Sequence, residues 1–265
     1  MVLNYSIQKA CNKKQVLKTI IGIDNFHFSS AIEKIKAAEV GGSTYIDIAA
    51  NVDMLLEVKS LVSLPVCVSS ICIQELEHCY NAGADMLELG NFDIFYDKNI
   101  SLTETNIIAM ARQLKHRVPE ASICVTIPHI LNINQKIILA KSLEDIGIDM
   151  IQTEGLISKQ TNTSCTSSFL SKASATLGHT AVLSNNINIP VIAASGISSL
   201  TAPVAIACGA AGVGIGSFFD NFQPLKELSQ EIKETAHMIQ LASLLNHNAN
   251  NSTLSLDRSS ILSKV

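Results

Sequence analysis

Short apolar runs alternate with helical patterns along this chain, and this alternation constrains the fold more than any other feature. A strand-type run followed by a helix and a second strand is the signature of a βαβ unit, and such units build parallel sheets. Most runs are apolar throughout, as expected for strands with helices on one face and a barrel interior on the other. Eight strands are predicted, at residues 18–23, 44–48, 65–69, 86–90, 122–126, 150–154, 190–194 and 212–216. We therefore expect an α/β chain folded as a single (β/α)8 TIM barrel.

Four of the joins between a helix and the next strand share one pattern, which supports the count of eight. In each join a glycine stands where the helix ends; these residues are Gly42, Gly83, Gly147 and Gly209. Helices often end on a residue with left-handed φ, which glycine adopts without strain. The joins precede the even-numbered strands, as in a repeat of two βα units. Ser30-x-x-Glu33 and Ser101-x-x-Glu104 read as capping boxes at helix starts.

The last two predicted strands end in small residues, which favours an anion site. Backbone N–H groups can approach an anion where no Cβ intervenes, and the loops after strands seven and eight bind phosphate in many TIM barrels. We predict a phosphate site formed by Ser195, Gly196, Ile197, Gly214, Gly216 and Ser217. Close packing of the barrel against its helices would also explain the small residues. The pattern does not distinguish a phosphorylated metabolite from FMN.

Polar residues occupy the carboxyl ends of the other strands, where TIM barrels carry their active sites. Groups that can hydrogen-bond are found at Asp24, Asn25, Asp47, Asn51, Ser69, Ser70, Glu88, Asn91, Thr126, His129, Gln152 and Glu154. Among them Asn25, Asn91 and Thr126 are predicted ligand contacts. Residues 91–100 and 155–168 form longer loops at the same end, and either could cover a ligand.

Three carboxylates and one histidine are the predicted catalytic groups. Asp47, Glu88 and Glu154 end strands two, four and six, so they are expected to face one another as general acid, general base or metal ligands. His129 follows strand five and is the histidine nearest to a strand end. Capping of loop N–H groups, or simple exposure to solvent, is the alternative role for each of these side chains.

A Schiff-base lysine and a zinc site are not expected here. Lys18 lies at the start of the first strand, so we expect it at the opposite end of the barrel, which argues against a Schiff-base aldolase. No HxH, HExxH or Cys/His cluster indicates a zinc site, and neither a Gly-x-Ser-x-Gly nor a P-loop pattern occurs.

Composition limits the partners and the compartment. A formal net charge of −4 without a basic run disfavours nucleic acid. No apolar stretch reaches the roughly 20 residues that cross a bilayer, so no membrane association is expected. Seven cysteines without a CxxC pair suit a reducing compartment.

The chain divides into a short N-terminal extension at residues 1–16, the barrel at 17–245 and a polar tail at 246–265. The tail is rich in Asn and Ser and poor in a regular apolar pattern, so we expect it to be disordered.

The chain resembles the hypothetical chloroplast reading frame number twenty-three family, proteins of unknown function encoded in algal plastids and in cyanobacteria. The matching segments are residues 20–26, 45–50, 88–96, 125–129 and 194–197. The resemblance spans roughly residues 17–245, and the segment 88–96 is the most distinctive. It implies an aldolase-type TIM barrel in the plastid, in the chloroplast stroma, and it transfers no catalytic residues.

Three functions fit these observations. The first is a metabolic enzyme that holds a small phosphorylated metabolite at the last two loops and uses the strand-end carboxylates for acid–base catalysis. The second is an FMN-dependent oxidoreductase. The third is a non-catalytic sensor or scaffold that binds a phosphorylated metabolite. Each is compatible with a homo-oligomer, since barrels often pair through their helices and loops.

Overall fold

The computed structural model describes residues 3–22, 28–90, 102–155 and 166–262, with the side chains of 28–30, 166–168 and 247–262 left undescribed. Eight parallel strands close into a barrel in chain order. Their bounds are β1 Val16–Gly22, β2 Tyr45–Ala49, β3 Val66–Ser70, β4 Met86–Leu89, β5 Ile123–Ile127, β6 Met150–Thr153, β7 Val191–Ala194 and β8 Gly212–Ile215. The predicted TIM barrel is therefore confirmed, and the apolar runs place most strand ends within one residue.

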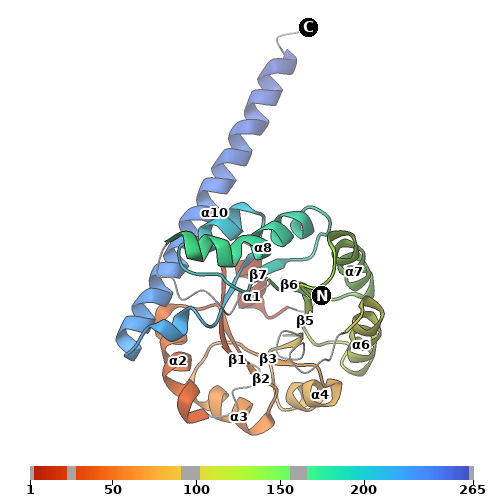
Figure 1. The fold of residues 1–265 in the computed structure, drawn as a ribbon, viewed down its shortest axis with the longest axis vertical. Coiled ribbons are helices and arrows are strands. Elements are labelled where there is room, and N and C mark those ends of the chain that lie inside the picture. The colour runs from red at the N-terminus through yellow and green to blue at the C-terminus, as the bar shows by residue number, and fades with distance from the viewer. Residues whose placement is uncertain (1–2, 23–27, 91–101, 156–165, 263–265) are drawn as a thin grey trace.

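Helices surround the barrel as an outer ring (Figure 1). They are α2 Phe28–Gly41, α3 Val52–Leu61, α4 Ile73–Asn81, α6 Glu104–Arg117, α7 Ile133–Ile146, α8 Thr166–Ser184, α9 Ala202–Ala207 and α10 Leu225–Leu262, with a 3-10 turn, η1, at Phe219–Asn221. The four glycines predicted at helix ends all have positive φ, between 82° and 100°. Both predicted caps are wrong. Ser30 lies inside α2, which begins at Phe28. The helix α6 starts after Thr103, whose side chain and that of Asn106 form the capping box, because Thr103 directly precedes the first helical residue.

The N-terminal extension forms a helix, α1 (Tyr5–Asn12), that closes one end of the barrel. Its Ile7 and Cys11 pack in one buried cluster with Val16, Tyr45 and Met86 from the strands. This apolar contact occupies the end at which the strands begin, so the opposite end, where they finish, is left for polar groups.

Inward-facing residues form layers inside the barrel, each contributed by four alternate strands. The strand registers give three successive layers. The lowest comes from the even strands and is Tyr45, Met86, Met150 and Gly212. The next comes from the odd strands and is Lys18, Cys67, Cys124 and Ile192. Above them the even strands supply a polar layer of Asp47, Glu88, Gln152 and Gly214.

The last helix is the longest element. From Leu225 it packs against α2 and α9, and Ser243 and Asn246 bond to the backbone of Lys13 and Ile206. Its remaining turns, to Leu262, extend away from the barrel (Figure 1). The predicted disorder of residues 246–265 stays a prediction. None of the helices in the described ranges combines the length and apolarity needed to span a membrane.

Candidate functional site

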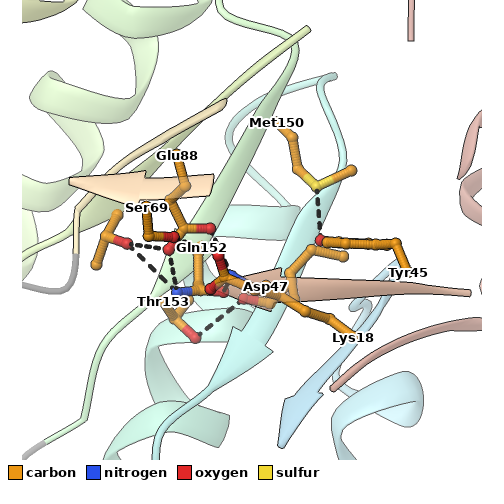
Figure 2. A network of polar contacts seen from close by, with 10 residues as sticks. Lys18, Tyr45, Asp47, Ser69, Glu88, Met150, Gln152 and Thr153 are labelled. Atoms are coloured by element: carbon orange, nitrogen blue, oxygen red, sulfur yellow. Dashed lines mark hydrogen bonds and ion pairs between the residues drawn. The ribbon is translucent and has the colours of Figure 1, made fainter. Parts of the chain in front are cut away.

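A buried ion cluster lies at the centre of the polar layer. Lys18 Nζ is 2.6 Å from Glu88 Oε2, 2.9 Å from Asp47 Oδ2 and 2.8 Å from Gln152 Oε1. All four side chains are at most 2% exposed. Figure 2 shows the Lys18 side chain extending from its strand into the group formed by the other three. The structure thus brings together two of the predicted catalytic carboxylates, Asp47 and Glu88.

The position of Lys18 corrects the sequence prediction. We expected its side chain at the opposite end of the barrel, but it points inward from the middle of β1 and reaches the layer above its own. The even-strand layer contains Gly214, and a Cβ there would lie 3.1–3.4 Å from Ile20, Ala194 and Gln152. These three neighbours fill the space beside Gly214, so a larger residue would be crowded at this position.

Hydrogen bonds complete the cluster. Thr126 Oγ1 donates to Glu88 Oε1 at 3.1 Å, and Gln152 Nε2 donates to the same oxygen at 2.7 Å. Ser69 donates to Asp47 Oδ1. Asp47 Oδ2 accepts no hydrogen bond of good geometry from the part of the chain with described side chains, although the Lys18 ammonium lies beside it. Thr126, predicted as a ligand contact, is here a partner of Glu88.

Charge and burial oppose each other in this cluster. Burial raises the pKa of Asp47 to about 6, since the positive charge of Lys18 compensates only part of the lost solvation. Burial by itself would lower the pKa of Lys18, but Asp47 and Glu88 together hold it well above its usual value. Lys18 is therefore an ammonium ion, and Asp47 can gain or lose a proton near neutral pH.

The other two predicted catalytic residues form a pair of their own. His129 Nδ1 is 3.1 Å from Glu154 Oε2, and the backbone N–H of His129 donates to the same oxygen at 3.0 Å. Both residues are mostly buried, at 14% and 4% side-chain exposure. Glu154 follows the end of β6 and stands one even-strand layer above Gln152. The sequence predicted that Glu154 would face Asp47 and Glu88, but it lies in a different layer.

A lysine–histidine pair lies next to Glu154. Lys136, on α7, has its Nζ 2.9 Å from His179 Nε2 on α8. Burial lowers the pKa of Lys136 to about 8, against the opposing effect of Glu154. Burial and then the Lys136 charge lower the pKa of His179, whereas a hydrogen bond to the backbone of Glu154 acts in the opposite sense.

The loop after β7 makes a sharp turn at the predicted phosphate site. Ser195 and Gly196 have φ of +81° and +70°. A Cβ at Gly196 would lie 2.4 Å from the Lys172 carbonyl, so only glycine fits. The Ser195 hydroxyl donates to the carbonyl of Gly155 at 3.1 Å, which connects this loop to the residue that follows Glu154.

The loop after β8 supplies the second half of the predicted phosphate site. Gly216 and Ser217 directly follow the strand. Lys34 Nζ, on α2, donates to the Gly216 carbonyl at 3.0 Å and to Asp220 Oδ1 at 2.7 Å. Burial lowers the pKa of Lys34, and Asp220 acts in the opposite sense.

Four backbone donors at these loops have no partner within the described ranges of the chain. They are the N–H groups of Gly196, Ile197, Gly216 and Ser217. Ile197 is buried, Gly196 and Gly216 are half-buried, and Ser217 is exposed. Buried N–H groups are nearly always paired in folded proteins. Four unpaired donors on two neighbouring loops are the arrangement that an anion would satisfy.

Two predicted contacts cannot be placed. Asn25 and Asn91 lie outside the described residues, as do most of the two loops predicted to cover a ligand, at 91–100 and 155–168. Among the side chains that are described, no three of the types His, Cys, Asp and Glu are grouped so as to hold a metal ion.

A separate cavity of about 250 Å³ lies at the other end of the barrel, beside α1. Asn12, Lys14, Ser184, Asn188 and Gly209 are among its lining residues. It is far from the strand ends that carry the ion cluster, because these residues belong to the segments that lead into the strands.

The sequence did not predict that four lysine and histidine residues would lie near the site. They are Lys18, Lys34, Lys136 and His179. Lys18 was detectable in principle, since Val16, Lys18 and Ile20 alternate inward along one strand. Lys34, Lys136 and His179 lie on helices, and the helical periodicity does not reveal which neighbouring element a buried polar side chain contacts.

Known relatives cover nearly all of the chain. The family model described as "Protein of unknown function (DUF561)" matches residues 2–244. "Uncharacterized protein ycf23" of Porphyra purpurea is 38% identical over 248 residues, which cover 94% of this chain and 92% of the relative. The protein of the same name in Cyanophora paradoxa is 33% identical over 244 residues, which cover 92% and 100%. The resemblance found in the sequence is thus confirmed.

Solved structures with the same fold are distant in sequence. Thiamine phosphate pyrophosphorylase from Pyrococcus furiosus aligns with a TM-score of 0.58 at 15% identity, over 87% of this chain and 98% of that protein. GGGPS from Thermoplasma volcanium aligns with a TM-score of 0.57 at 14% identity, over 88% and 97%. At these identities the likeness shows the barrel fold alone.

Proposed function

We propose that this chain, which belongs to the DUF561 family of proteins of unknown function, is an enzyme that performs acid–base chemistry on a small phosphorylated metabolite. The observation that carries this proposal is the set of four unpaired N–H groups at Gly196, Ile197, Gly216 and Ser217. They lie at the strand-end face of the barrel, above a buried layer of ionisable groups. An anion held by the loops would place the rest of the ligand near those groups.

Two sets of side chains would carry the proton transfers. The His129–Glu154 pair borders the phosphate loop, because the residue after Glu154 accepts a hydrogen bond from Ser195. Asp47 and Glu88 lie deeper, and the pKa of Asp47, raised to about 6 by burial, suits a group that exchanges protons at neutral pH. The N–H donors hold the phosphate, and these carboxylates and the imidazole move protons on the attached carbon skeleton.

An imine mechanism is not part of the proposal. A lysine that attacks a carbonyl must be a neutral amine. Lys18, which lies between Asp47 and Glu88, has a raised pKa and stays charged. Its role here is to compensate the carboxylates electrostatically.

The relatives support only part of this picture. Thiamine phosphate pyrophosphorylase has the same fold and a phosphate ester in its name, which is compatible with a phosphate site in this barrel. The name ycf23 shared by the relatives favours a plastid protein. We place the chain in the stroma, and fractionation of plastids with an antibody to the protein checks that placement.

A ligand screen tests the phosphate site. Purified protein is mixed with inorganic phosphate, a panel of sugar phosphates and FMN, and binding is read by thermal shift and mass spectrometry. Gly216→Asp places a negative charge at the donors, and the Cβ itself fits, since its nearest neighbours would be 3.4–3.6 Å away. Gly216→Asn, with the same shape and no charge, is the matched control.

Ligands that bind wild type and the Asn variant but not the Asp variant support the site. A ligand that stabilises all three proteins equally is bound elsewhere. If FMN alone binds, and the protein is yellow, an FMN-dependent oxidoreductase replaces the acid–base enzyme as the proposed function.

Catalysis is tested separately from binding. Glu88→Gln keeps the shape of the side chain and removes its charge, so turnover of a ligand found in the screen should be lost while phosphate binding persists. Wild-type turnover by this variant would make Glu88 structural. Binding without turnover in wild type would favour the sensor or scaffold.

A further inference from the structure

The loop after β8 is held from outside the barrel by a buried lysine. Lys34 Nζ donates to the Gly216 carbonyl oxygen at 3.0 Å and to Asp220 Oδ1 at 2.7 Å. The Lys34 side chain is 11% exposed, whereas Asp220 is 62% exposed. The backbone N–H of Phe219 donates to the same Gly216 oxygen at 3.0 Å. One carbonyl at the proposed phosphate site is therefore fixed by two donors, one of them charged.

Fixing this carbonyl also fixes the next N–H. The described chain has a single cis peptide, at Gln223–Pro224, so the peptide between Gly216 and Ser217 is trans. In a trans peptide the C=O and N–H bonds point in opposite directions. With the carbonyl directed toward Lys34 on α2, the Ser217 N–H is directed away from Lys34. This N–H is one of the four unpaired donors.

We infer that Lys34 is a positioning residue that aims the Ser217 N–H at the phosphate of the ligand and strengthens it as a donor. A carbonyl that accepts a hydrogen bond from an ammonium polarises its peptide, and the N–H of that peptide becomes a stronger donor. Lys34 itself stands on the far side of the peptide from the anion. Asp220 holds the ammonium from the solvent side. The inference rests on the proposed phosphate site and adds a residue on α2 to it.

The test compares two lysines on the same helix. Lys34→Met removes the charge and the contact with Gly216. Lys36→Met removes the same charge from an exposed position of α2. Titration with inorganic phosphate, followed by calorimetry, should show affinity about tenfold weaker in Lys34→Met, the loss expected for one charge-assisted hydrogen bond. Lys36→Met should bind as wild type does.

Asp220→Asn distinguishes orientation of the Ser217 N–H from general stabilisation of the loop after β8. The amide oxygen can still accept from Lys34, so the contact between Lys34 and Gly216 persists, and phosphate affinity should stay at the wild-type level or rise. Equal weakening in Asp220→Asn and Lys34→Met would mean that the ion pair acts by holding η1, and the inference would be wrong.

A measurement on wild type keeps the test decisive if Lys34→Met does not fold. In the amide NMR spectrum, saturating inorganic phosphate should move the Ser217 proton downfield together with those of Gly196 and Ile197. Shifts at Gly196 and Ile197 without one at Ser217 would overturn the role of Lys34 and leave the phosphate site intact. Absence of shifts at all three would refute the phosphate site itself.

Discussion

At the scale of single residues, Lys18 places one positive charge between two buried carboxylates. Removing one member of a buried ion cluster leaves uncompensated charge in a poorly solvated interior. Lys18→Met should therefore lower the free energy of unfolding by about 3–5 kcal/mol, measured by urea denaturation at pH 7.

The control for Lys18→Met is a triple variant that also carries Asp47→Asn and Glu88→Gln. It has no buried charge left in the polar layer, and most of the lost stability should return. A triple variant as unstable as the single one would show that the lysine stabilises the barrel through packing rather than charge.

Asp47 makes stability depend on pH. Burial raises the pKa of Asp47 from 3.8 to about 6, so the folded protein binds the proton more tightly than the unfolded chain does. The resulting stabilisation is complete below pH 3.8 and is lost as the pH rises through about 6. The difference in unfolding free energy between wild type and Asp47→Asn should therefore fall on the order of 1–3 kcal/mol from pH 4 to pH 7.

Urea denaturation at a series of pH values checks this dependence. Asp53→Asn, at an exposed position of α3, controls for the loss of one carboxylate. A difference between wild type and Asp47→Asn that rises with pH would mean that the ion pair with Lys18 outweighs burial.

At the scale of elements, the strands were predictable and the contacts between helices were not. An apolar run such as Val66–Cys67–Val68 favours a strand buried on both faces, because it is too short for a helix and follows a proline. The partner of Lys136, which is His179 on α8, depends on how two helices are rotated against each other. Side-chain packing decides that rotation, so it cannot be predicted from the sequence pattern of one helix.

The sequence pattern also does not determine the residue at which a helix begins. Ser101-x-x-Glu104 fits a capping box in sequence, yet Thr103 is the residue that caps α6. Thr103→Ala should lower the free energy of unfolding by about 1 kcal/mol, since the hydroxyl satisfies an N–H of the first turn. Thr103→Ser, which retains the hydroxyl, should cost much less; equal losses in the two variants would show that the methyl group matters instead.

At the scale of the whole molecule, the layers divide the barrel between an apolar end and a polar end. The lowest layer is apolar and is covered by α1, whereas Lys18, the Asp47 layer and the loops above it carry the charges and the unpaired donors. The sequence predicted that Asp47 and Glu88 would share a level, since alternate strands contribute to one layer. It could not predict that Lys18 would reach them, because a long side chain can extend toward either end of a barrel and follows the space that its neighbours leave.

The most direct test of the phosphate site is a crystal structure of the protein with a phosphorylated ligand from the screen. The account predicts phosphate density within hydrogen-bond distance of the N–H groups of Gly196, Ile197, Gly216 and Ser217, with the carbon skeleton directed toward Glu154 and Asp47. Phosphate bound instead in the cavity beside α1, against Asn12, Lys14 and Asn188, would contradict it.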